Sequence, residues 1–167
     1  SFYYPDTKNG GSWKTTKPKE EMNEISDLDK KKNQNLKKLA KMVRSWKNKH
    51  GLEIGGLLID TLSYNFFKQT DVYDSKSFNY YDELFRDFFS FMSELPEQDR
   101  YSAPGSNQHV KVKNPFQKKA KKAYELCKEA IEAETEKIAN DKWRAIFGRA
   151  FPVTEVSVVE SFSKSEA

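Results

Sequence analysis

Two consecutive helical segments of different character, between Leu36 and Gln69, constrain the fold more than any other stretch of the sequence. In the first, apolar residues recur at the three- and four-residue spacing of an amphipathic helix, and the other faces carry lysine and arginine. The second, from about Glu53 to Lys68, is apolar on almost every side. A helix of that kind must be covered by its neighbours, so we expect it at the centre of a helical core.

Punctuation and spacing along the chain predict the other elements. His50 and Gly51 separate the first two helices, because glycine accepts the left-handed conformation that ends many helices. Apolar residues at helical spacing indicate two more helices, at about 80–95 and about 116–147, the second with a break near Glu134. The pattern predicts an all-α fold, a helical bundle of four main helices with an irregular N-terminal segment.

The length of 167 residues and the aromatic content of 14% are enough for one domain with its own core. We expect residues 1–29 to form an irregular segment, residues 30–152 the helical bundle domain and residues 153–167 a flexible C-terminal tail. The chain lacks an initiator Met and opens on SFYYPD, which looks like mid-protein sequence. We therefore expect it to be a piece of something longer.

Cysteine usage and hydropathy indicate the compartment. The single cysteine, Cys127, cannot form an intramolecular disulfide, which favours a reducing compartment and a cytoplasmic location. No signal peptide is visible, and no apolar run approaches the length that spans a bilayer. We expect no membrane partner.

Charge is distributed unevenly, although the net charge of +4 is modest. Residues 30–52 and 101–124 contain basic residues and no acid, whereas acids concentrate at 82–99 and 125–141. Separate basic and acidic faces follow. On the first helix the basic face lacks acids at i, i+4, which leaves two interpretations, a solvated surface or a site for a phosphate-bearing partner. Its residues are Lys37, Lys41, Arg44 and Lys47.

Gly55 and Gly56, at the start of the apolar helix, also have two interpretations. Glycine allows close helix packing, and it allows a ligand to approach the backbone at a helix N-terminus, where free N–H groups attract anions. Both stay open at this point.

No catalytic constellation is visible. Asp27 and Asp29 have the spacing of a metal-binding pair, but the lysines that follow favour a helix N-terminal turn. His50 and His109 are the only histidines, which with Cys127 excludes a zinc set. No glycine-rich phosphate loop occurs. On its residues alone the chain is a binding or supporting module.

Four stretches, in the same order, carry a resemblance to a known family: YYPDTKNGGSWKTTKP, LKKLAKMVRSWK with GGLLIDTL, APGSNQHV, and KWRAIFGRAFP. Together they resemble the C-terminal helical half of bacterial nucleotidyltransferases related to cyclic GMP-AMP synthase and oligoadenylate synthase, the SMODS-type enzymes of cyclic-oligonucleotide antiphage signalling. The resemblance covers residues 2 to 152. It implies the helical domain of a polymerase-β-like nucleotidyltransferase.

In that family the first half carries a Gly-Ser turn and three metal-binding acids, and no Gly-Ser with a following Asp-x-Asp is present here. The resemblance implies that the intact enzyme joins nucleoside triphosphates through 3′-hydroxyl attack on an α-phosphate, with Mg²⁺ held by the missing half. The partners of this chain would be nucleoside triphosphates and that catalytic N-terminal half. Alone, the chain is expected to be inactive.

The resemblance also implies site residues on the helical wall of the nucleotide cleft. Lys41 is the best match for the family's phosphate-binding lysine, with Arg44 and Lys47 as further cations. Gly55 and Gly56 stand where the family has a Ser-Tyr pair that contacts phosphate and stacks on a base. This departure means that another aromatic must stack, or that donor-nucleotide selection differs.

Ser106 and Asn107, in the APGSNQHV loop, have side chains suited to hydrogen bonding a base or ribose, or to bonding within the turn. An alternative function is a non-enzymatic helical module that binds nucleic acid or a regulatory protein through the basic face. A third possible function is a helical scaffold that binds no ligand. A concave pocket favours the first hypothesis, and an open basic stripe with steep salt dependence favours the second.

Overall fold

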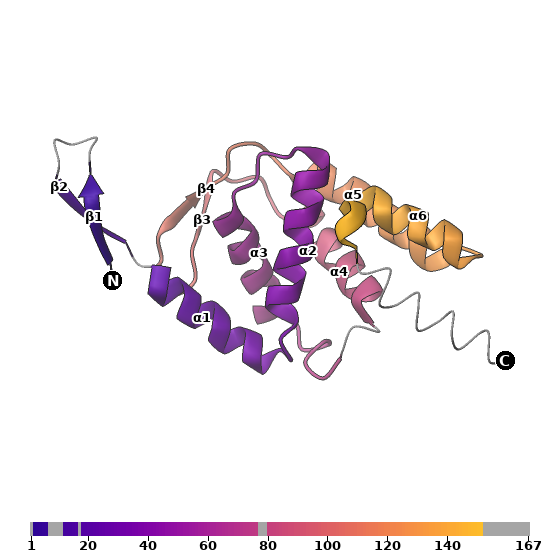
Figure 1. The fold of residues 1–167 in the computed structure, drawn as a ribbon, viewed down its shortest axis with the longest axis horizontal. Coiled ribbons are helices and arrows are strands. Elements are labelled where there is room, and N and C mark those ends of the chain that lie inside the picture. Colours follow the sequence, from indigo (N-terminus) through magenta and orange to yellow (C-terminus); the bar gives the residue numbers. More distant parts are fainter. Residues whose placement is uncertain (1, 7–11, 17, 77–79, 152–167) are drawn as a thin grey trace.

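The structure, a computed structural model, describes residues 2–6, 12–16, 18–76 and 80–151, and it confirms the predicted all-α fold (Figure 1). The expected tail at 153–167 lies outside the described residues. The elements, in chain order, are β1 (Phe2–Asp6), β2 (Ser12–Thr16), α1 (Pro18–Lys31), α2 (Asn35–His50), α3 (Gly56–Lys68), α4 (Tyr81–Glu94), β3 (Arg100–Ser102), β4 (His109–Lys111), α5 (Gln117–Glu132), α6 (Glu136–Phe147) and the short 3-10 helix η3 (Gly148–Ala150).

The two helices that anchor the sequence pattern form as expected. Gly51 ends α2 in the left-handed conformation, with a φ of 61°. Helix α3 lies between α2 and the β3–β4 hairpin (Figure 1), and its side chains at Ile59, Leu62 and Phe67 are fully buried. The predicted central position of α3 is therefore confirmed.

The prediction of an irregular segment at 1–29 is wrong for the residues that the structure describes in this range, 2–6, 12–16 and 18–29. Strands β1 and β2 form an antiparallel hairpin, with Phe2 opposite Thr16. Residues 18–31 form helix α1, which packs on α2 and α3 and so extends the bundle toward the N-terminus. Its first turn is acidic and its last turn is basic, which favours a helix through the macrodipole.

Four main helices were expected, and the described residues contain six α-helices. Besides α1, the difference is a break in the predicted long helix, which separates into α5 and α6. The break is fixed at Thr135, whose side-chain oxygen accepts a hydrogen bond from the backbone N–H of Ile138 at 3.2 Å and caps α6. The β3–β4 hairpin, in which Tyr101 pairs with Val110, lies between the helices predicted at about 80–95 and about 116–147.

The core joins large side chains on α4 to small ones on α5. Helix α4 buries Leu84, Phe85, Phe88, Phe89 and Met92, whereas α5 buries Ala120, Ala123, Cys127 and Ala130. The small residues of α5 leave room for the phenylalanines of α4, whose rings fill the space between the two helices. Cys127 is fully buried in this core, and burial raises the pKa of its thiol well above the ordinary value.

Aromatic stacking attaches the end of the chain to this core. The rings of Trp143 and Phe151 stack with centroids 5.3 Å apart, and the ring of Phe147 lies 4.7 Å from that of Phe85 on α4. These contacts give Trp143, Phe147 and Phe151 a structural role. In the described part of the chain, no helix combines the length and apolarity that a membrane span requires.

Candidate functional site

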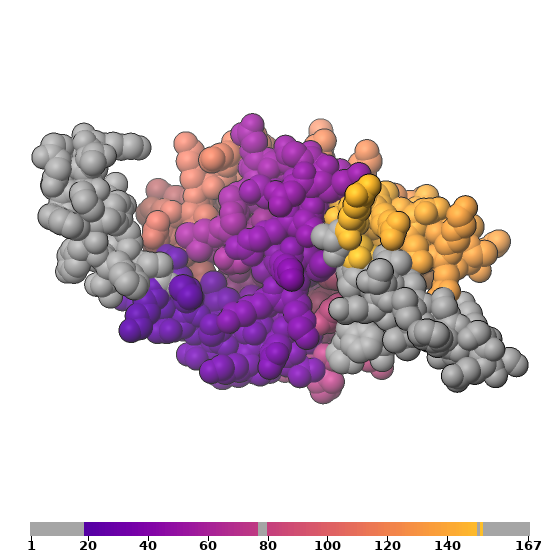
Figure 2. All heavy atoms as spheres, in the orientation of Figure 1, coloured from indigo at the N-terminus to yellow at the C-terminus, as the bar shows by residue number. Residues whose placement is uncertain are grey.

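A pocket of about 360 Å³ lies between α1 and α2, which are neighbours on the face seen in Figure 2. Its apolar residues are Met22, Ile25, Leu36 and Ala40, and its polar residues are Ser26, Lys37, Lys41, Arg44 and Asp60. We call this the α1–α2 pocket. An apolar floor beside three cations suits an anion that carries an apolar part.

The helical period places the cations on one side of α2. Lys37, Lys41 and Arg44 follow one another at four and three residues, next to the buried stripe that contains Leu36 and Ala40. Lys37 and Lys41 are exposed, and neither is ion-paired to an acid within the described residues. Their ammonium groups are therefore available to a ligand.

Arg44 is differently placed, because it joins α2 to α3. Its guanidinium forms a two-pronged ion pair with Asp60, with both N–O distances at 2.8 Å. It also donates to the backbone carbonyl of Gly56 at 3.2 Å. A guanidinium has five N–H donors, so these three bonds leave it able to donate to a ligand at the pocket edge, although Asp60 offsets its charge.

The two glycines at the start of α3 have different surroundings. A Cβ atom on Gly56 would lie 3.2 Å from Nη2 of Arg44, so the close-packing interpretation applies to this glycine. Gly55 is the exposed N-cap residue, with open space where a Cβ would stand and no side chain to cap the helix. Gly56 borders Arg44, and neither glycine lines the pocket.

The other predicted site residues lie outside the pocket. Lys47 is one helical turn beyond Arg44 and is half-buried. Ser106 donates its hydroxyl hydrogen to Glu21 of α1 at 2.7 Å and accepts from the backbone N–H of Gln108 at 3.1 Å. Asn107 is exposed at the same turn with a φ of 59°. Turn bonding, the second interpretation of this loop, is thus present.

The β3–β4 turn braces the start of α1. A Cβ atom on Gly105, which has a φ of 80°, would lie 2.5 Å from the backbone oxygen of Glu20, so only glycine fits there. Farther along α1, the hydroxyl of Tyr64 donates to Glu24 at 2.6 Å. Burial, the hydrogen bond and the charge of Glu24 together raise the pKa of Tyr64 to about 12. These contacts hold α1 as one wall of the pocket.

Asp27 and Asp29 lie near the end of α1 and do not form a metal pair. Asp29 is buried, and its carboxylate accepts the backbone N–H of Lys37 at 2.9 Å. It therefore caps the first turn of α2, whose N-cap residue Gln34 contributes no side-chain bond. Across the part of the chain that the structure describes, no group of three or more His, Cys, Asp or Glu side chains is arranged to hold a metal ion.

Sequence reasoning missed the residues that α1 and α3 contribute to the pocket. They are Met22, Ile25, Ser26 and Asp60. The acidic start and basic end of residues 18–31, with Ile25 and Leu28 three apart, were a usable helix signal. The partnership of Asp60 with Arg44 has no comparable signal, because the two residues belong to different helices.

The comparisons with known proteins return nothing: no protein-family model, curated protein or solved structure matches the chain. What defines the site is therefore its own geometry, a pocket between two helices with an apolar floor and a cationic edge.

Proposed function

We propose that this chain is the C-terminal helical part of a cyclic-oligonucleotide synthase and that its α1–α2 pocket forms part of the wall of the nucleotide cleft. The observation that carries the proposal is that Lys41 and Arg44, both expected to bind nucleotide, line one concave pocket beside an apolar floor. The order of the four family-like stretches is a second support. Lys37, which shares the pocket, adds a third cation.

In this proposal Lys37 and Lys41 neutralise phosphate charge, and Arg44 adds directed donors while Asp60 holds its guanidinium in place. The apolar floor receives the base or sugar, a role for which Met22 is suited because it is exposed at the pocket edge. Ser106 acts indirectly, by bracing α1 through Glu21, and Asn107 belongs to the same turn. Lys47 and Gly55 flank the cations and contact only a larger ligand.

The described residues do not fit a magnesium site, because they bring no cluster of acids together. The proposal therefore places Mg²⁺ and the bond-forming chemistry in a separate catalytic half. This chain contributes ligand positioning and charge neutralisation, and by itself it has no activity.

A titration with ATP or GTP, with and without Mg²⁺, followed by backbone amide and methionine methyl NMR shifts, tests the proposal. We expect saturable shifts at Met22, Lys41 and Gly56. The affinity derived from them should be at least tenfold weaker in Lys41→Ala. The matched control is Lys38→Ala, which removes an exposed lysine of the same helix that does not line the pocket.

Two outcomes would overturn the proposal. Shifts seen only with oligonucleotide, spread along α2 and abolished by salt, would favour the non-enzymatic module. Equal weakening by Lys41→Ala and Lys38→Ala would indicate a diffuse charge effect with no defined pocket.

A further inference from the structure

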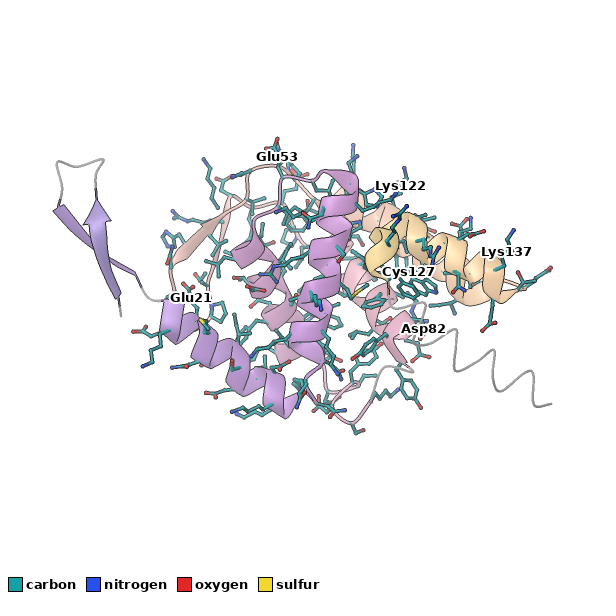
Figure 3. All side chains as sticks on the ribbon, in the orientation of Figure 1. Glu21, Glu53, Asp82, Lys122, Cys127 and Lys137 are labelled. Carbon is teal, nitrogen blue, oxygen red and sulfur yellow. The ribbon has the colours of Figure 1, made fainter. Side chains whose placement is uncertain are left out.

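The first half of α5 carries a second group of cations, remote in sequence from the α1–α2 pocket. Lys118, Lys119, Lys121 and Lys122 are all exposed. At the helical period they cover an arc of about 160° on the side opposite the buried Ala120 and Ala123. Figure 3 shows Lys122 projecting from α5 away from the core.

The positions of these lysines destabilise helix α5. Lysines three and four residues apart on a helix repel each other, and positive charge in the first turn opposes the helix dipole. The first turn of α5 contains no acid, whereas those of α1 and α4 contain Glu20 and Glu21, and Asp82 and Glu83, respectively. Folding alone does not favour this arrangement.

Internal partners do not relieve the repulsion. In the described chain, none of the four lysines is ion-paired to an acid. The second half of α5 differs, because its charged residues have partners. Lys128 pairs with Glu125 at 3.1 Å, and Lys142 of α6 approaches Glu129 at 3.9 Å. An external anion would supply the missing partner.

The surface beside these lysines is hollowed. Two adjoining pockets, of about 100 and 280 Å³, share His50, Leu52 and Lys119. Lys122 lines the smaller one. Nε2 of His50 lies 3.0 Å from the carbonyl oxygen of Ile146, and since a carbonyl only accepts, Nε2 carries the hydrogen. The one acid that lines either pocket is Glu53, which accepts a hydrogen bond from Asn114 at 3.0 Å.

We propose that the four lysines of α5 bind the phosphate backbone of a nucleic-acid duplex. We call them the α5 lysine surface. Lys118 and Lys121 lie outside both pockets, so a single nucleotide held there reaches only part of the surface, whereas an extended polyanion reaches all of it. Phosphates along a duplex provide a continuous row of charge for such an arc.

The residue types favour backbone contacts to a duplex. Single strands bind through exposed aromatic rings, but the aromatic residues that line the two pockets, Trp46 and Phe116, are each only 2% exposed. Lysine provides charge without the fixed two-pronged geometry by which arginine reads guanine. The α5 lysine surface is therefore suited to binding that does not depend on base sequence, and it shares no residue with the α1–α2 pocket.

The test is fluorescence anisotropy with a labelled DNA duplex of about 20 base pairs, measured across a series of salt concentrations. The variant is Lys119→Gln with Lys122→Gln, which keeps helix propensity because glutamine and lysine are similar helix formers. The matched control, Lys30→Gln with Lys137→Gln, removes the same charge from exposed positions elsewhere (Lys137 is labelled in Figure 3).

We expect the wild-type protein and the control to bind alike, and the α5 variant to bind at least tenfold more weakly at low salt. The slope of log affinity against log salt should shrink by about 2, which is roughly 0.9 for each lost phosphate contact. Absence of duplex binding at low salt, equal loss in the control, or displacement by polyglutamate as effective as by unlabelled duplex would overturn the proposal. Because Lys119 and Lys122 lie outside the α1–α2 pocket, the result does not depend on the proposed nucleotide site.

Discussion

The α1–α2 pocket and the α5 lysine surface both present basic residues, but only the pocket contains a cation, Arg44, that is bonded to partners within the fold. In the pocket, Arg44 is bonded to Asp60 and to the carbonyl of Gly56, so its charge also serves to join two helices. On α5, the four lysines have no ion-pair partner within the described residues and lie against the helix dipole. Similar runs of basic residues thus have a partly structural role in one region and none in the other.

The comparison shows why charge runs alone do not define a site. A cation that is tied to its neighbours is held in one geometry and can orient a small ligand. A cation that is unpaired on a convex helix moves freely and suits a partner that is recognised by total charge. The following predictions test this difference.

The largest expected effect is on stability. Arg44→Ala removes the ion pair and leaves Asp60 without its partner, so we expect the free energy of unfolding to fall by about 2 kcal/mol, a value that allows for the partial exposure of both side chains. Lys119→Gln with Lys122→Gln should leave it unchanged or raise it by about 0.3 kcal/mol, because repulsion is relieved. Urea denaturation measures both.

Asp60→Asn is the companion variant, since it keeps the shape of the side chain and removes its charge. A loss smaller than that of Arg44→Ala is expected, because the amide oxygen still accepts from the guanidinium. If the α5 variant were destabilised as much as Arg44→Ala, the contrast between the two regions would be wrong.

An intermediate effect on stability is expected at alkaline pH, where Tyr64, which donates a hydrogen bond to Glu24 of α1, loses its proton. The pKa of Tyr64 is raised from 10.0 to about 12, so the folded protein keeps this proton after the unfolded chain has lost it. The stabilisation is complete below pH 10 and is lost as the pH rises from 10 to 12.

Tyr64→Phe isolates this contribution. The free energy of unfolding of the wild type should fall more steeply between pH 10 and 12 than that of the variant, as measured by urea denaturation at each pH. The pKa of Tyr73 is also raised, by burial and by its hydrogen bond to Asp87, but Tyr73 is present in both proteins and cancels in the difference. Parallel curves would contradict the role given to Tyr64.

The smallest expected effects are at the two glycines of α3. Gly55→Ser should raise the free energy of unfolding by about 0.3 kcal/mol, because serine caps a helix slightly better than glycine and the space is open. Gly56→Ala should bring no gain in the wild type, since its Cβ would displace the Arg44 guanidinium. In an Arg44→Ala background, Gly56→Ala should raise the free energy of unfolding by about 0.5 kcal/mol. Chemical denaturation of the four proteins gives this cycle.

The helices with clear apolar spacing were predictable. The expected ranges for α2, α3 and α4 differ from the observed ones by three residues or fewer at either end, because spacing and stop signals agree there. Helix α1 was missed because its sequence is polar and its apolar positions are few. The break between α5 and α6 was visible only as an interruption near Glu134, and the cap at Thr135 determines it.

The site was predictable only where it lies on one helix. The spacing of Lys41 and Arg44 on α2 is local information, and it places both at the pocket. The opposite wall depends on contacts across the fold, such as the bond between Ser106 and Glu21, which are 85 residues apart in the sequence. The orientation of Arg44 toward Asp60 is likewise a tertiary property that no periodicity encodes.

The sole cysteine offers a chemical record of how the bundle opens. Cys127 lies in the interface of α4 and α5, labelled in Figure 3, and a thiol with a raised pKa in a dry interior is almost unreactive while the helices stay together. A thiol-specific reagent therefore modifies the protein only in molecules whose α4 and α5 have separated. The rate of modification, measured against reagent concentration, reports the frequency of that separation in native conditions.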